Sequence, residues 1–204
     1  MVVPGKVDSI VKLSVSLYFC YMCGRFNFSN HSKVKGVKKA GIKSSYNIAP
    51  ASEIAVINEE GNCIKLNWGF TPSWLKQGQI INAKRETVRV KSTFKGFRKC
   101  FVPINGWYEW LKTNDGNKPY YFHSEYDTIY VKSIMRESTV ILLTTQAMSN
   151  LSHIHDRMPL LTNELSFHNW NLNQVDIDIK SYEVSREISY AANDGADLIK
   201  PLYK

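Results

Sequence analysis

The sequence has little of what marks a disulfide-stabilised or metal-binding protein. Its 204 residues include only four cysteines, Cys20, Cys23, Cys63 and Cys100, too few and too scattered for a disulfide framework. Cys20 and Cys23 form a Cys-x-x-Cys pair, but a zinc site needs a second ligand pair at matching spacing. We therefore expect no metal and no other cofactor. The cysteine content favours a reducing, intracellular location in the cytoplasm, nucleus or nucleoid.

Long apolar runs are also missing. The apolar stretch at residues 10–21 is interrupted by Lys12 and is too short to span a bilayer, so we expect no membrane association. The first residues contain no Ala-x-Ala-like cleavage site and no arginine, which argues against a secretory signal and a mitochondrial presequence. We interpret residues 1–22 as a leader that is removed or, if translation starts at Met22, never made.

Acidic side chains are scarce relative to basic ones. The chain has 26 Lys and Arg against 18 Asp and Glu, a formal charge of +8. Such a balance favours nucleic acid as a partner, followed by an acidic membrane surface, with a solvated lysine-rich face as the ordinary alternative. Hydrophobic content of 44% and this length predict one globular domain. The lysine-rich residues 31–45 are expected to form an exposed helix or loop.

Short apolar and β-branched runs between turn residues predict a fold made mainly of strands. A helix is expected at 163–170, which makes the fold class α+β. The expected strands are 54–58, 63–70, two within 99–110, 118–123, 128–134 and 140–145.

Six short motifs occur in a fixed order along the chain. They are Met22–Phe26 (MCGRF), Tyr46–Pro50 (YNIAP), Trp68–Trp74 (WGFTPSW), Ile81–Thr87 (INAKRET), Arg98–Trp110 (RKCFVP followed by GWYEW) and His155–Pro159 (HDRMP). In that order they resemble the SOS response-associated peptidase (SRAP) family of abasic-site processing proteins, over about residues 22–201. The resemblance implies one domain at 23–204, with a mainly antiparallel sheet or distorted barrel core and peripheral helices.

The resemblance also implies a chemistry. Family members act as monomers on single-stranded DNA and capture an abasic site as a covalent thiazolidine, which protects the lesion during the DNA damage response. Lyase, crosslink-reversal and autoproteolytic (protease, hydrolase) activities are also attributed to them. Only an N-terminal cysteine carries an amine and a thiol on one residue, so Cys23 is the expected nucleophile once it becomes the terminus. A neighbouring cation such as Arg25 raises the thiolate fraction of a cysteine.

Three further residues are catalytic candidates by the same resemblance. Glu109 lies among aromatic residues, which desolvate a carboxylate, raise its pKa and suit it to proton transfer. His155 is a natural proton shuttle, and Asn82 can orient the cysteine and the lesion sugar. Each also has an ordinary interpretation: Glu109 as a solvent-facing strand residue, His155 as a structural histidine, and Asn82 as a strand-end residue.

DNA contacts are expected from cations on phosphates and from rings on bases. The resemblance assigns these contacts to Arg25, Pro50, Trp68, Lys84, Trp110 and Arg157. The family usually has arginine where Lys84 stands, and lysine lacks the bidentate fork. Trp74 is expected in the core, because it follows Pro72 in what looks like a packed turn.

Two other functions stay open from the residues alone. One is a non-covalent single-strand binding module whose cysteine is blocked by the leader. The other is a thiol peptidase acting on other proteins, in which His155 could act as the base, although the sequence identifies no carboxylate or amide that would orient it.

Overall fold

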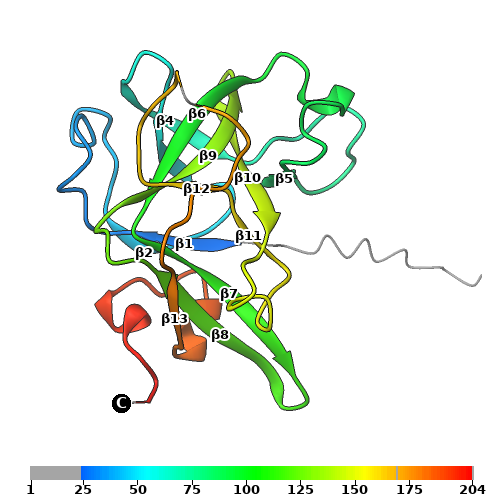
Figure 1. The fold of residues 1–204 in the computed structure, drawn as a ribbon. Coiled ribbons are helices and arrows are strands. Elements are labelled where there is room, and N and C mark those ends of the chain that lie inside the picture. The colour runs from blue at the N-terminus through cyan, green and yellow to red at the C-terminus, as the bar shows by residue number, and fades with distance from the viewer. Residues whose placement is uncertain (1–23, 169, 204) are drawn as a thin grey trace, which may run out of the picture.

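Strands make up nearly all the regular structure of the protein. The computed structural model describes residues 24–168 and 170–203 (Figure 1). In chain order, the strands of this part are β1 (Arg25–Phe28), β2 (Ser45–Ile48), β3 (Glu53–Ile57), β4 (Cys63–Trp68), β5 (Asn82–Lys84), β6 (Arg98–Ile104), β7 (Gly106–Thr113), β8 (Gly116–His123), β9 (Ile129–Arg136), β10 (Thr139–Gln146), β11 (Arg157–Pro159), β12 (Leu161–Thr162) and β13 (Lys180–Glu183).

One sheet closes on itself. Its eight strands include the path β10-β4-β3-β6-β9, and a further pairing of β9 with β10 completes a ring. The pairing is antiparallel around the ring except between β10 and β4, and β5 also joins β10 in parallel. Closure leaves these five strands without free edges. The expectation of a distorted, mainly antiparallel barrel core is confirmed.

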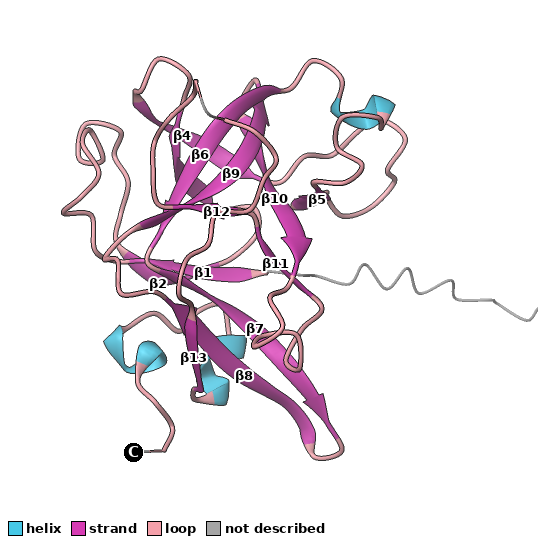
Figure 2. Cartoon of the chain, in the orientation of Figure 1, coloured by secondary structure: helices cyan, strands magenta, loops and turns pink. Residues whose placement is uncertain are grey.

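The second sheet has five strands in the order β13-β8-β7-β1-β2 (Figure 2). Its longest element is the β7–β8 hairpin, which the turn residues Asn114 and Asp115 close. β6 leads directly into β7 through Asn105, so this connection passes the chain from the barrel to the second sheet.

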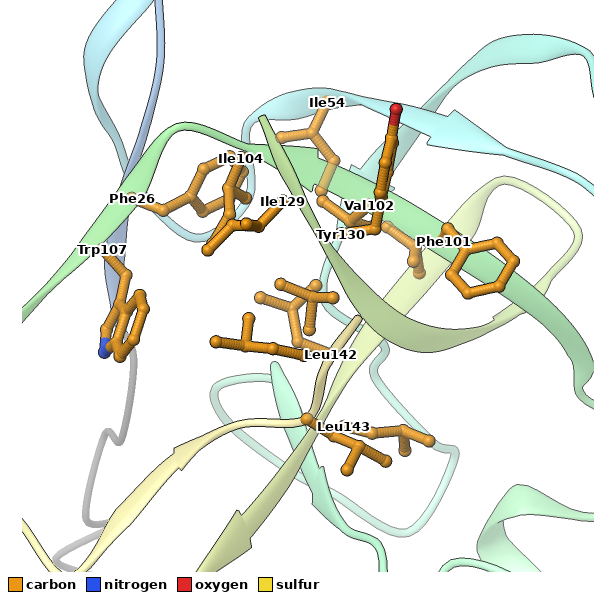
Figure 3. Close-up of a cluster of buried hydrophobic side chains, with 14 of the residues drawn as sticks. Phe26, Ile54, Phe101, Val102, Ile104, Trp107, Ile129, Tyr130, Leu142 and Leu143 are labelled. Atoms are coloured by element: carbon orange, nitrogen blue, oxygen red, sulfur yellow. The ribbon is translucent and has the colours of Figure 1, made fainter. Parts of the chain in front are cut away.

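A common core joins the two sheets. Phe26 of β1 and Trp107 of β7 are buried together with barrel residues such as Ile104 and Leu142 (Figure 3). The Phe26 ring also lies 5.1 Å from the ring of Trp68 at the end of β4. The apolar face of β1 is therefore fixed against the barrel, and with it the position at which the described chain begins.

Helices are far fewer than the α+β class with peripheral helices requires. Among the described residues only three short 3₁₀-helices occur: η1 (Ser92–Phe94), η2 (Arg186–Ser189) and η3 (Ala196–Ile199). The helix expected at 163–170 is not formed over 163–168 or at Trp170. There the Phe167 ring packs 4.7 Å from Phe101, and the Trp170 indole donates to the Cys100 carbonyl at 3.3 Å. Anchoring on β6 decides the path of this segment.

The lysine-rich residues 31–45 form a loop of turns that leads into β2. Most of its lysines are exposed, while Val34 and Val37 are buried and hold the loop on the core. Within the described residues, no helix is both long and apolar enough to cross a membrane.

Candidate functional site

A cavity of about 370 Å³ lies at the beginning of β1. It is lined by Gly24, Arg25, Pro50, Trp110, Asn117 and Ser189. Three of the six residues expected to contact DNA therefore meet at one place, although they come from β1, the turn after β2, and β7. Cys23 lies outside the described residues, but its neighbour in the chain, Gly24, forms part of the cavity wall.

Arg25 is held in this wall by the C-terminal segment. Its Nη1 donates to the Asn47 side chain at 2.8 Å and to the Ile188 carbonyl at 3.4 Å, and its Nη2 donates to the Ser189 carbonyl at 3.3 Å. Burial lowers the pKa of the Arg25 guanidinium, which still carries its charge at neutral pH. The indole of Trp110 donates to the Ser189 hydroxyl at 3.2 Å. Ser189 thus contacts both Arg25 and Trp110 and holds the two side chains next to each other.

Pro50 is placed by a strained turn. The following residue, Ala51, has a φ of 68°, the left-handed region that residues with a Cβ seldom adopt. Its backbone N–H donates to the Trp68 carbonyl at 2.9 Å, which fixes the turn against the end of β4. Strain of this kind is often found where a side chain must be presented at a functional site.

Glu109 is on β7 directly before Trp110, in register with Tyr120 of β8. Only 2% of the residue is exposed, so the interpretation as a solvent-facing strand residue is wrong. A carboxyl group at this depth is costly unless it is partnered.

A second group of candidates gathers around β10. Asn82 and Lys84 of β5 stand in register with Leu142 and Thr144, while Arg157 of β11 stands opposite Gln146 on the other edge of β10. Lys84 is exposed. Strand β10 thus pairs with two segments more than 70 positions apart in the chain, and these segments contain three of the residues predicted from the sequence.

Arg157 is the most extensively bonded of these side chains. It forms a bidentate ion pair with Glu86 at 2.8 and 2.9 Å, and its Nη2 also donates to the Thr144 carbonyl at 2.8 Å and to the Thr144 hydroxyl at 3.2 Å. The hydrogen bond from Arg157 is the main cause that lowers the pKa of Glu86. Glu86 is a site residue that no sequence pattern indicated, although it lies within the motif Ile81–Thr87.

His155 precedes β11 and has a largely buried ring. The backbone N–H of Arg157 donates to its Nδ1 at 3.1 Å, so in the neutral ring the proton lies on Nε2. The Asp156 carboxylate also lies 3.1 Å from Nδ1, so two groups of the adjoining chain contact this nitrogen. No group of three or more metal-ligating side chains occurs among the described residues.

The structure reverses the roles expected for two tryptophans. Trp68 is completely buried and its indole donates to the Ile81 carbonyl at 3.0 Å, so it offers no ring face to DNA. Trp74, expected in the core, is 62% exposed in the loop between β4 and β5. The polar neighbours Ser73 and Lys76 were a signal for exposure of Trp74.

Trp68 nevertheless joins the two groups of candidates. Its ring packs on Phe26 of β1, close to the cavity, and its N–H holds Ile81, the residue directly before Asn82. Figure 1 shows the beginning of β1 and strand β11 on the same side of the molecule. Asn117 and Ser189 also line the cavity. No local pattern indicates either residue, because both depend on distant contacts.

Fold and site together define a small barrel domain with a cationic, ring-lined cavity at the start of its first strand. The family profile described as SOS response associated peptidase (SRAP) matches residues 22–190. The chain therefore belongs to the SRAP family, as its motifs predicted.

Curated relatives agree with this assignment, and a solved structure shares the fold. The chain is 26% identical over 189 residues to the abasic site processing protein YedK of Escherichia coli (strain K12), covering 77% of this chain and 84% of the relative. It is 26% identical over 222 residues to the abasic site processing protein YoqW of Bacillus subtilis (strain 168), covering 88% and 99%. A crystal structure of a Bacteroides thetaiotaomicron protein superposes with a TM-score of 0.66 at 16% identity, over 88% of this chain and 99% of that one, and supports the fold.

Proposed function

We propose that this protein processes abasic sites in single-stranded DNA by forming a covalent bond through Cys23. The observation that carries the proposal is the cavity whose wall contains Gly24, Arg25, Pro50 and Trp110. The wall provides a cation for a phosphate and a ring for a base. It also includes Gly24, the residue directly after the proposed nucleophile. The names of the curated relatives support the choice of an abasic site as the target.

The proposed chemistry needs Cys23 as the first residue. Its amine attacks the aldehyde carbon of the ring-opened sugar and forms an imine, and one water leaves. The thiolate then adds to the imine carbon, the nitrogen takes up a proton, and a thiazolidine ring closes. No oxidant, reductant or cofactor is consumed. If the thiol does not add, the imine also permits β-elimination, which gives the lyase activity attributed to the family.

Three residues divide the remaining work in this proposal. Glu109, at 2% exposure, passes a proton during opening of the sugar ring. His155 protonates the sugar oxygen or the imine nitrogen, and its contacts at Nδ1 hold the ring in place. Asn82 orients the cysteine and the sugar by hydrogen bonds.

Noncovalent binding in this proposal comes from cations and rings around the cavity and β10. Arg25, Lys84 and Arg157 contact phosphates, Pro50 is a wedge beside the lesion, and Trp110 stacks on a base. Trp74 is added to this surface because 62% of it is exposed, and Trp68 moves to a positioning role. High salt should weaken the first encounter but should not release a finished adduct.

Residues 1–22 are, in this proposal, a leader absent from the active form. Translation from Met22 followed by removal of that methionine would expose Cys23, and so would cleavage after Met22. If the leader is removed by autoproteolysis, the Cys23→Ala protein should retain residues 1–22. If translation starts at Met22 and an aminopeptidase removes that methionine, the Cys23→Ala protein should lack residues 1–22.

Intact mass measured with and without an abasic single-stranded oligonucleotide tests the proposal. The full reading frame and a chain starting at Met22 are compared. A protein that begins at Cys23 should gain the mass of one oligonucleotide less one water. Cys23→Ala should lose the adduct and keep DNA binding. The matched control is Cys63→Ala, since burial raises the pKa of the Cys63 thiol and makes it a poor nucleophile.

The other outcomes separate the alternatives. DNA binding without any adduct, in both forms of the chain, would leave a non-covalent binding module and refute the covalent mechanism. Loss of DNA binding in Cys23→Ala would mark a structural cysteine. Cleavage of an added peptide with no DNA adduct would point to a peptidase acting on other proteins.

A further inference from the structure

A mainly apolar recess lies outside the site, on the outer face of the barrel. Its volume is about 590 Å³, within the range of ligand-binding cavities. The floor contains Phe94 and Phe97, whose rings meet edge to face at 6.1 Å, together with Ile134 of β9 and Trp170. Because flat side chains form the floor, the cavity suits a flat, apolar group rather than a sugar or an extended peptide backbone.

The rim of this cavity carries one sign of charge. Its charged lining residues, Arg89, Lys91, Lys95 and Lys99, are all cations and all exposed. The Lys99 amine lies 5.5 Å from the centre of the Trp170 ring, which shows that cations and rings already meet there. Val90 between two of the cations is 80% exposed. An exposed apolar side chain on a cationic rim favours a ligand that is both aromatic and anionic.

A chain of contacts connects this cavity with the site around β10. Arg157 pairs with Glu86, the Arg85 guanidinium lies 3.7 Å from the same carboxylate, and Arg85 also donates to the Leu172 carbonyl at 3.0 Å. Leu172 lines the cavity, and the lining segment begins at Val88, four positions after Lys84. The cavity therefore continues the surface on which the proposed function places phosphates.

We propose that this cavity holds an unpaired base of the same DNA strand, at a position beside the lesion, while the rim cations hold the flanking phosphates. The proposal rests on the proposed function and adds a second contact point for the strand. Stacking on Phe94 and Phe97 supplies affinity without strong sequence preference, because every base has a π-face. The rim cations make this contact dependent on salt.

The experiment measures the dissociation constant of the full chain for abasic oligonucleotides lengthened one nucleotide at a time on either side of the lesion. On one side, affinity should rise about tenfold when the added base reaches the cavity. Phe94→Ala should remove this step, and Lys91→Glu with Lys95→Glu should remove it too. The matched control, Lys38→Glu with Lys39→Glu, makes the same charge change in the loop before β2 and should keep the step.

A second arm separates the base from the phosphates. Replacing the added nucleotide with an abasic spacer keeps its phosphate and should lose the step in the unchanged protein. In Phe94→Ala, spacer and nucleotide should bind equally well. Adduct formation on the shortest oligonucleotide should stay within about twofold in all variants. Failure of that reaction would count against the proposed function rather than against the cavity.

Three results would overturn the proposal. The first is a length dependence that Phe94→Ala leaves unchanged. The second is equal binding of spacer and nucleotide in the unchanged protein, which would reduce the cavity to a basic surface. The third is an affinity that does not rise at any oligonucleotide length. If Phe94→Ala then abolishes saturable binding of an acidic, tryptophan-containing peptide or of a mononucleotide, the cavity belongs to that ligand instead.

Discussion

Replacing Arg157 with lysine tests how the structure uses this side chain before DNA arrives. The guanidinium donates to Glu86 twice and to Thr144 twice, and only 11% of the side chain is exposed. Lysine keeps the charge but cannot reproduce the planar fork, so it can satisfy only part of this set. Arg157→Lys should therefore destabilise the folded protein even without DNA.

The size of the loss follows from the two partners. Glu86 is 43% exposed, so its ion pair contributes about 0–1 kcal/mol after screening by water. The two bonds to buried Thr144 contribute about 1 kcal/mol each, although its carbonyl keeps a second bond from the Arg85 N–H at 2.9 Å. The free energy of unfolding should fall by about 2 kcal/mol, which lowers Tm by about 4–8 °C for a chain of this size.

The same contact predicts a dependence on pH. The pKa of Glu86 is lowered in the folded state, first by the hydrogen bond from Arg157. A carboxylate with a lowered pKa stabilises the folded protein above its ordinary pKa of 4.5, and this contribution is lost as pH falls through the folded-state value. The wild-type protein should therefore lose more stability on acidification than Arg157→Lys does.

Thermal unfolding followed by circular dichroism at pH 7 and at a series of acidic pH values measures both effects. Glu86→Gln is the matched control, because it removes the same titration and leaves the arginine in place. An Arg157→Lys protein with an unchanged Tm at pH 7, and a pH profile parallel to that of wild type, would refute the reasoning. It would mean that Arg157 is free in solution.

Three further changes test other parts of the structure. Trp68→Phe removes the N–H that holds Ile81, so the free energy of unfolding measured by chemical denaturation should fall by about 1 kcal/mol. The rate of adduct formation should fall more than the rate of DNA binding. An equal fall in both rates would count against a positioning role. Gly106→Ala brings a Cβ onto the Phe122 carbonyl and the Tyr121 ring, and should lower Tm by 10 °C or more, on the order of a severe core defect; an unchanged melting curve would contradict the close approach. Burial raises the pKa of Tyr121, so its contribution to stability is complete below pH about 10 and is lost as pH rises above that value; Tyr121→Phe should flatten the alkaline part of the stability profile, measured by urea unfolding.

Local sequence was a good guide to the strands. The strands predicted at 54–58, 118–123 and 128–134 begin and end within two positions of β3, β8 and β9. Alternation and turn residues are local properties of the chain, so they can be read without knowing the partner strands. The order of the six motifs likewise predicts the SRAP family without reference to the fold.

Local sequence was a poor guide wherever exposure depends on distant partners. The helix expected at 163–170 does not form over its described residues, where Phe167 and Trp170 are held by contacts with β6. The roles of Trp68 and Trp74 were exchanged for a similar reason. Trp68 is covered by Phe26 of β1 and by the Ile81 carbonyl, which are distant in the sequence, whereas Ser73 and Lys76 were a local signal for the exposure of Trp74.

The sequence by itself determined the family, the strand-rich class and the candidate catalytic residues, because motifs and alternation are patterns of neighbouring residues. Tertiary structure alone decided the closure of the barrel, the pairing of Arg157 with Glu86, and the meeting of Arg25, Pro50, Trp110 and Ser189 around one cavity. Those features join residues far apart in the chain. Their free energy comes from burial and hydrogen bonds that exist only after the two sheets have packed together.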